Sequence, residues 1–208
     1  MKEVSLLAMS ILCLLSTSVA TGPKAIQTMY TEGIFQVDIP SDFTRVTGSK
    51  LEEFRNMWVG GARDLADESG LADPNYLTKI KLSFFSIFQK SNGKLTIAFM
   101  GMSVPDTMNL DEMLKTNTDR TRWGIEAGHL SRSSKGVSKL MIDSVSCLLM
   151  DIESAAGSRL LTYSFFLPKH PKYSFALGIA CDDKATYEKD QNVIVAIVKS
   201  IRITRAVR

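Results

Sequence analysis

Alternating apolar residues open the part of this chain that is expected to fold. In GIFQVDIPSDFTRV, residues 33–46, Phe35, Val37 and Ile39 are apolar and the positions between them are polar. This two-residue period is typical of a strand with one buried face. The Pro-Ser-Asp sequence at 40–42 is typical of a turn. We therefore predict a hairpin across residues 33–46.

Two helices are predicted from the residues that begin them. Ser49 and Asn109 are each followed three residues later by a glutamate, the spacing of a capping box. Apolar residues then recur at helical intervals. The pattern predicts helices over about 50–59 and 109–123. Residues 60–76 are polar and rich in turn formers, which indicates a long loop.

Asn92 and Gly93 give the strongest turn signal in the chain. They lie between the apolar runs KIKLSFFSIF and KLTIAFMGMSV, and both residues readily adopt the positive φ that a tight hairpin turn requires. In the second run, apolar residues occupy both odd and even positions, so both faces of the strand are apolar, with Leu95 on one face and Met100 on the other. A strand of this kind is covered on both sides.

Three more apolar runs, 144–153, 159–167 and 173–181, are separated by short connections. Short connections favour a sequential antiparallel meander. A short last strand ends at Ile203. Before it, four apolar residues at helical spacing mark the buried stripe of a C-terminal helix: Ile194, Ile197, Val198 and Ile201.

These elements predict an α+β fold in which an antiparallel β-sheet is covered by helices on both faces, an α/β/α sandwich. The chain has 208 residues, of which 45% are hydrophobic and 23% charged, and this composition fits one domain. We place that domain at 33–208, after a lead-in segment at 21–32.

The first 20 residues are typical of an export signal. A charged start is followed by an apolar run at 4–15 and by small residues up to Ala20. The run is shorter than the roughly 20 residues of a membrane-spanning helix. We predict cleavage of residues 1–20 after Ala20, a periplasmic or secreted protein and no stable membrane span. A retained anchor, or lipid attachment at Cys13, is the alternative.

The charge balance argues against a nucleic-acid partner. The net charge of +3 does not change on cleavage, because the signal carries one lysine and one glutamate. The basic residues are scattered along the chain, whereas nucleic-acid binders gather them on one face.

Cys147 and Cys181 remain after cleavage, and an even pair in an exported chain raises the question of a disulfide. In a meander these residues lie on its two outer strands. Two strand spacings, about 9.6 Å, plus an offset along the strands exceed the roughly 7 Å between Cα atoms that a disulfide tolerates. We predict two buried, unpaired thiols. A different strand order leaves the disulfide open.

Candidate catalytic groups are few. His129 and His170 are the only histidines, and both lie in loop contexts. The chain has no Gly-x-Ser-x-Gly elbow, Walker loop or dinucleotide fingerprint, and no cysteine or histidine spacing typical of zinc sites. We therefore assign no catalytic, cofactor-binding or metal-binding residue.

Two charged groups have a functional and a plainer interpretation. The acidic residues do not match a calcium-binding loop and are best read as solvated charge. They are Asp64, Asp67, Glu68, Asp182 and Asp183. A basic strip could face an anionic partner, although a solvated edge is the commoner meaning of such a strip. It consists of Arg120, Arg122, Arg132 and Lys135.

A group of methionine and phenylalanine residues is adaptable enough to line a pocket for an apolar ligand, but its strand periodicity favours a place in the core. The group consists of Phe84, Phe88, Phe99, Met100 and Met102.

The order of the predicted elements resembles the Mog1/PsbP-like fold. Three local pieces carry the resemblance: the opening FQVDIPSDF, the central KLTIAFMGMSV and the closing VAIVKSIRI. The resemblance implies partner binding more than catalysis and supplies no catalytic residues. The segment 60–76 looks long for the family.

We therefore expect an exported, non-catalytic protein-interaction module of the bacterial envelope. It would bind another envelope or secreted protein through a sheet edge or a helix-flanked loop. A carrier of a small apolar ligand is the alternative, and a hydrolase without a recognisable motif is the third possibility.

Overall fold

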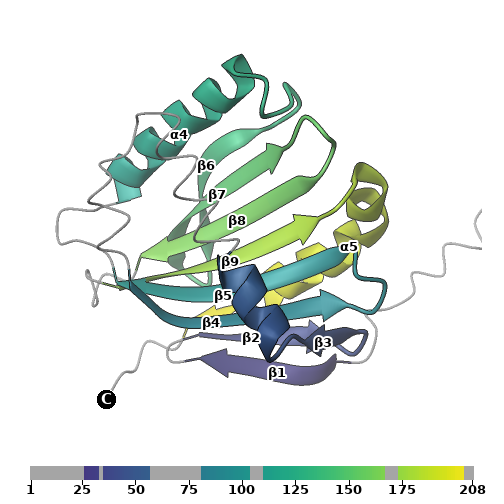
Figure 1. Cartoon of the computed structure of the whole chain (residues 1–208). Coiled ribbons are helices and arrows are strands. Elements are labelled where there is room, and N and C mark those ends of the chain that lie inside the picture. The colour runs from purple at the N-terminus through teal and green to yellow at the C-terminus, as the bar shows by residue number, and fades with distance from the viewer. Residues whose placement is uncertain (1–25, 33–34, 57–80, 104–109, 167–172, 204–208) are drawn as a thin grey trace, which may run out of the picture.

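A computed structural model describes residues 26–32, 35–56, 81–103, 110–166 and 173–203 (Figure 1). Two antiparallel sheets make up its core: a seven-stranded sheet in the order β3-β4-β5-β9-β8-β7-β6, and a three-stranded sheet in the order β1-β2-β10. The strands are β1 (Ile26–Glu32), β2 (Phe35–Pro40), β3 (Phe43–Arg45), β4 (Lys81–Lys90), β5 (Leu95–Ser103), β6 (Gly136–Ile142), β7 (Val145–Glu153), β8 (Arg159–Phe166), β9 (Tyr173–Cys181) and β10 (Arg202–Ile203). The helices are α4 (Leu110–Glu126), α5 (Lys184–Ser200) and a helix at residues 49–56.

The predicted hairpin across residues 33–46 is wrong. Its two strands form, but β2 pairs with β1 and β10, whereas β3 pairs with β4. The chain thus changes sheets at the turn that follows Pro40. β2 pairs instead with β1, which lies within the segment 21–32 that we predicted to be a lead-in.

The central hairpin and the meander are confirmed. β4 and β5 pair around Asn92 and Gly93, and β7, β8 and β9 pair in sequence order. β9 also pairs with β5, which joins the hairpin to the meander. The helix expected over 109–123 is observed as α4, and the loop expected at 60–76 lies outside the described residues. β6, the seventh strand of this sheet, is not among the strands predicted from the sequence.

The inner strands of the seven-stranded sheet are buried on both faces. On one face, Leu95 belongs to a large core cluster that the three-stranded sheet and α5 help to close. Three rings stack through this cluster: the centroid of Phe175 lies 4.7 Å from that of Phe35 and 4.4 Å from that of Phe165. On the other face, Met100 packs in a smaller cluster with side chains of the helix at 49–56.

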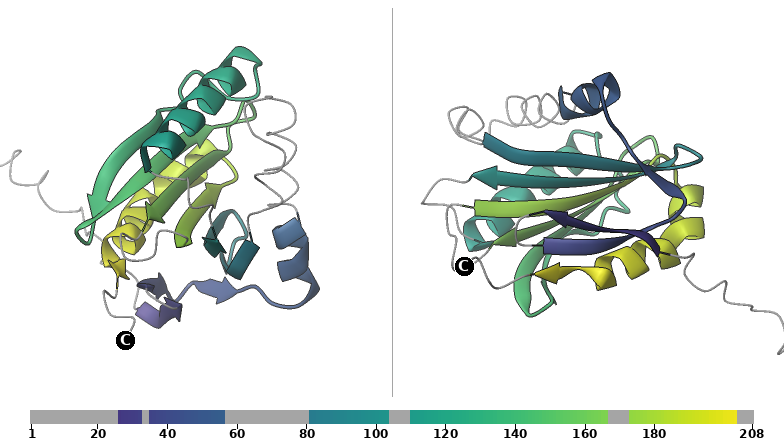
Figure 2. Two further views of the ribbon diagram at one scale, coloured as in Figure 1. Left: turned by 90° about the vertical axis from the view of Figure 1, so that its left-hand side faces the viewer. Right: turned by 90° about the horizontal axis from the view of Figure 1, so that it is seen from below.

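The α+β class with a large antiparallel sheet is therefore confirmed. Figures 1 and 2 show α4 and the helix at 49–56 on one side of the sheet and α5 on the other. The face with α5 is shared by a second sheet, so helices alone do not cover it.

Both cysteines are buried and unpaired, as predicted. They lie on β7 and β9, the two neighbours of β8. Cys147 is opposite Phe165 of β8 and Cys181 is opposite Arg159, so the offset along β8 is six residues. Burial raises the pKa of both thiols to about 12, which keeps them protonated and unreactive at neutral pH.

Candidate functional site

β6 is the open edge of the seven-stranded sheet. Within the described residues it pairs with β7 alone, from Gly136 to Ile142. None of its residues is buried, whereas β7 has three buried residues. Met141 on β6 is 62% exposed, more than any other large apolar side chain described. An edge strand presents unpaired N–H and C=O groups, which a further strand can use.

The turn that joins β6 to β7 is strained and anchored. Asp143 and Ser144 have φ of 48° and 62°, the left-handed region that favours glycine or asparagine. An Asp143 Oδ2 atom accepts a hydrogen bond from the backbone N–H of Ile203 at 2.6 Å. The end of the three-stranded sheet therefore holds this turn in place.

α4 lies against β6 and β7 and is tied to the edge strand by an ion pair between Asp111 and Lys139. Lys139 is the only charged residue of β6. Because its charge is matched by Asp111, β6 carries little of the repulsion with which edge strands usually deter pairing.

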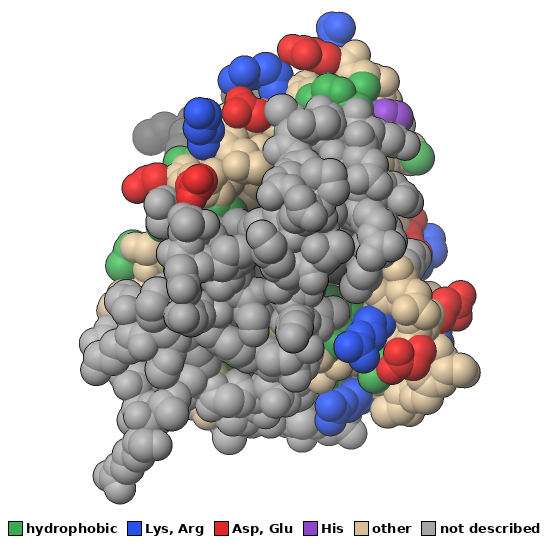
Figure 3. Space-filling model, turned by 60° about the vertical axis from the view of Figure 1, so that its left-hand side comes forward, with side chains coloured by type: hydrophobic (Ala, Val, Ile, Leu, Met, Phe, Trp, Pro, Cys, Tyr) green, Lys and Arg blue, Asp and Glu red, His purple; other side chains and the backbone are tan. Residues whose placement is uncertain are grey.

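The predicted basic strip does not form a concentrated cationic surface. Arg122 lies 3.6 Å from Asp119 in the same helix, and Lys135 lies 3.9 Å from Asp151. Arg132 is exposed in the loop before β6. On the face shown in Figure 3, Lys and Arg side chains alternate with Asp and Glu around α4. This arrangement fits a solvated edge.

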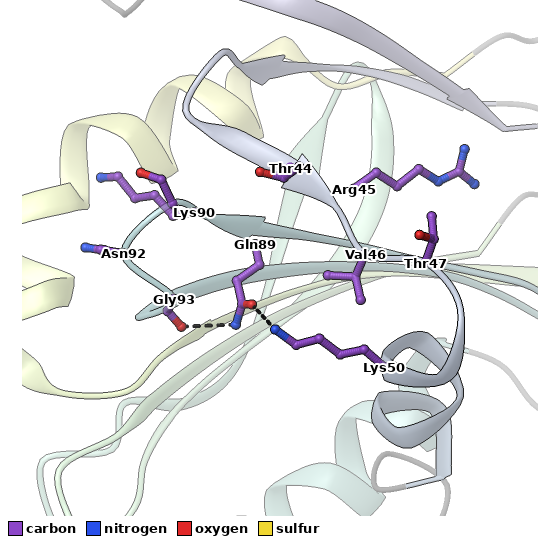
Figure 4. Close-up of a pocket in the computed structure, with 10 residues that line it drawn as sticks. Thr44, Arg45, Val46, Thr47, Lys50, Gln89, Lys90, Asn92 and Gly93 are labelled. Atoms are coloured by element: carbon purple, nitrogen blue, oxygen red, sulfur yellow. Dashed lines mark hydrogen bonds between the residues drawn. The ribbon is translucent and has the colours of Figure 1, made fainter.

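An open hollow of about 550 Å³ lies where β3, the β4–β5 turn and the helix at 49–56 meet (Figure 4). The Lys50 Nζ atom donates to Gln89 Oε1 at 2.8 Å, and Gln89 Nε2 donates to the Gly93 carbonyl at 3.1 Å. Arg45 and Lys90, which also line the hollow, extend away from this contact. Its polar groups thus bond to one another and do not converge on a shared point.

The Lys90 side chain instead forms a buried ionic cluster on the α5 side of the sheet. Its Nζ atom lies 2.5 Å from Asp190 Oδ1 of α5 and 3.8 Å from Asp42 Oδ2 of the β2–β3 turn. Asp190 was not predicted as a candidate, although it lies on the same helical stripe as Ile194 and Ile197. A carboxylate among the apolar positions of an amphipathic helix is the signal that points to a buried partner.

A second cluster fixes α5 to the meander. Arg159 donates two hydrogen bonds of 2.8 Å to the carboxylate of Asp151, and its guanidinium stacks on the Tyr187 ring at 4.1 Å. The hydrogen bonds to Asp151 raise the pKa of Arg159 above its ordinary value. Bidentate pairing of this kind orients side chains firmly.

The other predicted candidates are dispersed. His129 is exposed and its ring lies 5.3 Å from that of Trp123. Asp183 caps α5 by accepting a hydrogen bond from the Thr186 N–H, and this bond lowers its pKa to about 2. His170 and the acidic residues at 64–68 lie outside the described residues.

The methionine and phenylalanine group does not line one pocket. Phe88 and Phe99 belong to the large core cluster, whereas Met100 is on the opposite face of the sheet. The side chains of Phe84 and Met102 are outside the described part.

Among the described residues, no group of three or more His, Cys, Asp or Glu side chains could hold a metal ion. The helices described are also too short or too polar to cross a membrane.

The fold class of this chain is evident from its similarity to solved structures, whereas comparison of its sequence with known proteins finds no match. No protein-family model matches the sequence, and no curated protein matches it either. The structure search supports the predicted resemblance, and the chain has a PsbP/Mog1-like fold.

Two solved structures carry this conclusion. The solution structure of the cyanobacterial PsbP protein CyanoP, from Synechocystis sp. PCC 6803, is similar with a TM-score of 0.52 and 8% identity, over 91% of this chain and 99% of that chain. LpqN of Mycobacterium tuberculosis, described as involved in cell envelope biogenesis, is similar with a TM-score of 0.51 and 10% identity, over 88% and 99% of the two chains. At these identities the likeness concerns the fold alone.

Proposed function

We propose that this protein is an exported, non-catalytic interaction module of the bacterial envelope, an α/β/α sandwich that binds an extended segment of another protein along β6. The observation that carries the proposal is the open edge itself. β6 has seven residues, no proline and an unbroken register with β7. The opposite edge strand, β3, has three residues. Strand addition to an edge of this length is a common way to recognise an extended peptide.

The composition of β6 favours a partner segment with alternating apolar residues. Leu140 and Ile142 are half-buried and pack against the large core cluster, whereas Met141 projects from the other face. An added strand would place its own side chains beside these two rows. The apolar residues of such a segment would extend both rows.

Export and partner class rest on further support. Residues 1–20 have the pattern of a cleaved signal, and one structural neighbour is described as involved in cell envelope biogenesis. Neither buried thiol is suited to act as a nucleophile, because burial raises the pKa of each to about 12.

A charged substitution at the edge tests the proposal. Met141→Lys adds a gatekeeper charge at an exposed position, so it should disfavour strand addition with little effect on folding. Val195→Lys on α5 is the matched control, because Val195 is the other exposed large apolar residue described, at 42%. Tagged variants are expressed with their own signal in the native host, and co-purified proteins are quantified by mass spectrometry.

We expect at least one envelope protein to be lost from Met141→Lys and retained by Val195→Lys. Equal recovery by both variants would contradict binding at β6. Turnover of a substrate by the purified mature protein in a hydrolase panel would contradict the non-catalytic part of the proposal.

A further inference from the structure

The turn between β6 and β7 determines which backbone groups of β6 face away from β7. Only Asp143 and Ser144 separate the two strands, both have positive φ, and together they form a hydrogen-bonded turn. In a two-residue hairpin of this kind the flanking residues, Ile142 and Val145, exchange backbone hydrogen bonds with each other. The N–H and C=O groups of Ile142 therefore point towards β7.

The same alternation holds along the whole of β6, because its register with β7 runs without a bulge from Gly136 to Ile142. The residues at even positions bond to β7. The backbone groups of the three residues at odd positions point to the open edge of the sheet, and we call these the outward residues: Val137, Lys139 and Met141. Within the described part of the chain no further strand pairs with them there.

Hydrogen bonds at the far end of β7 support this assignment. If β6 alternates in this way, odd residues of β7 face β6 and even residues face β8. The Glu153 N–H donates to Ser134 Oγ, just before β6, at 2.9 Å. The next N–H, that of Ser154, donates to the Ser158 carbonyl, just before β8, at 2.8 Å. The alternation assigned from the turn is therefore the same at the other end of the hairpin.

The side chains of the outward residues lie on the α4 face of the sheet, because Lys139 pairs with Asp111 of α4 and alternate residues of a strand share a face. Residues of an added strand that lie directly opposite would contact them on this face. Val137 is half-buried and Met141 is exposed, so apolar residues fit opposite both. A charged residue opposite Lys139 would face either the lysine or the carboxylate that neutralises it, so an uncharged residue fits there.

We propose that the partner segment joins β6 antiparallel, through the N–H and C=O groups of the outward residues, and that its five central residues are apolar, apolar, uncharged, any and apolar. This inference rests on the proposed function and specifies the partner. The five residues lie opposite Met141, Leu140, Lys139, Ser138 and Val137 in that order. Leu140 calls for an apolar neighbour because it is half-buried against the large core cluster. Antiparallel addition continues a sheet in which every pair is antiparallel, and antiparallel pairs are slightly more stable per residue.

Amide hydrogen exchange of the mature protein alone, followed by NMR, tests the assignment without any partner. The amides of the outward residues should exchange at least about tenfold faster than those of residues 138, 140 and 142, which bond to β7. Equal rates, or slower exchange of the outward residues, would overturn the inference, because these groups would then already be bonded by another part of the chain or by a second copy.

Proline substitutions extend the test to binding. Lys139→Pro removes an outward N–H, which an edge strand tolerates, whereas Ser138→Pro removes an N–H that bonds to β7 and should lower the thermal midpoint more. Lys139→Met is the matched control, because it removes the charge and keeps the N–H. In the native host, a benzoylphenylalanine at position 141 reports the partner. Its crosslinked product should fall at least about tenfold in Lys139→Pro and persist in Lys139→Met.

The outcomes separate this inference from the proposed function. Equal products from Lys139→Pro and Lys139→Met would overturn the inference and leave contact at β6 intact. No product in the wild-type background would overturn the proposed function and the inference with it. The crosslinked peptide is sequenced by mass spectrometry, and a segment without the five-residue pattern would contradict the inference. If Lys139→Pro does not fold, Met141→Pro with the crosslinker at Val137 takes its place and is judged in the same way.

Discussion

The two edges of the seven-stranded sheet are built differently. At one edge, β3 has three residues and continues into the helix at 49–56, next to the buried cluster of Lys90 with Asp42 and Asp190. At the other edge, β6 has seven residues, and its one lysine is paired on the surface. The first edge is protected by its short length and buried charge, whereas no further strand of the described residues pairs with the second. The buried charge stabilises one edge of the sheet, and the proposed binding edge is the other.

The largest effect is expected at the protected edge. Lys90→Met removes the cation between two buried carboxylates and should lower the free energy of unfolding by about 3–5 kcal/mol. Lys94→Met is the control: Lys94 pairs with Asp183 on the surface, at 3.1 Å, and its loss should have a much smaller effect because solvent screens this exposed pair. Urea denaturation measures both. Similar losses would show that the protected edge does not depend on its buried charge.

A smaller effect of opposite sign is expected at the open edge. Ser144→Gly relieves a left-handed serine in the β6–β7 turn and should raise the free energy of unfolding by about 0.5–1 kcal/mol. Ser146→Gly, two residues later in β7, is the control and should lower it. A destabilising Ser144→Gly would mean that the turn is not strained.

The reactivity of the two cysteines tests whether the strand next to β6 is as well protected as the middle of the sheet. Because burial raises the pKa of Cys147 and Cys181 to about 12, neither thiol should react with iodoacetamide at pH 8 unless the protein opens. Alkylation is followed by mass spectrometry, with urea-unfolded protein as the fully reactive reference. Rapid labelling of Cys147, one strand from β6, would show that the open edge unravels and is not a stable template.

The smallest effect concerns the cap of α5. The pKa of Asp183 is about 2 in the folded protein and 3.8 ordinarily, so its stabilising effect is full above pH 3.8 and is lost as the pH falls through 2. Asp183→Ala should lower the thermal midpoint slightly at neutral pH, and the difference from wild type should narrow between pH 4 and pH 2. A difference that stays constant over this range would contradict the cap.

Local signals predicted local structure well. Asn92 and Gly93 determine their own hairpin, and the short connections of the meander leave neighbouring strands little choice of partner. The pairing of β2 with β1 and β10 could not be predicted from such local signals. Gln36 pairs with Arg202 at the far end of the chain, and β1 shows no clear apolar period.

The site was harder to predict than the fold. β6 is an edge strand with one paired lysine and no buried residue, so its sequence lacks the strong alternation of an inner strand. The charged pair of Lys90 and Asp190 joins residues 100 positions apart. Only the position of Asp190 on an apolar helical stripe hinted at it. The basic strip was visible in the sequence, as was Asp119, three residues before Arg122. The acidic partner of Lys135, Asp151, becomes evident only in three dimensions.

Site-specific photo-crosslinking tests the open edge most directly. A benzoylphenylalanine placed at Met141, and separately at Val195, is activated by light in cells of the native host. Both positions are exposed and apolar, so they differ mainly in their place relative to β6. The account predicts a discrete crosslinked envelope protein from position 141 and none from position 195. The same product from both positions, or products from 195 alone, would contradict it.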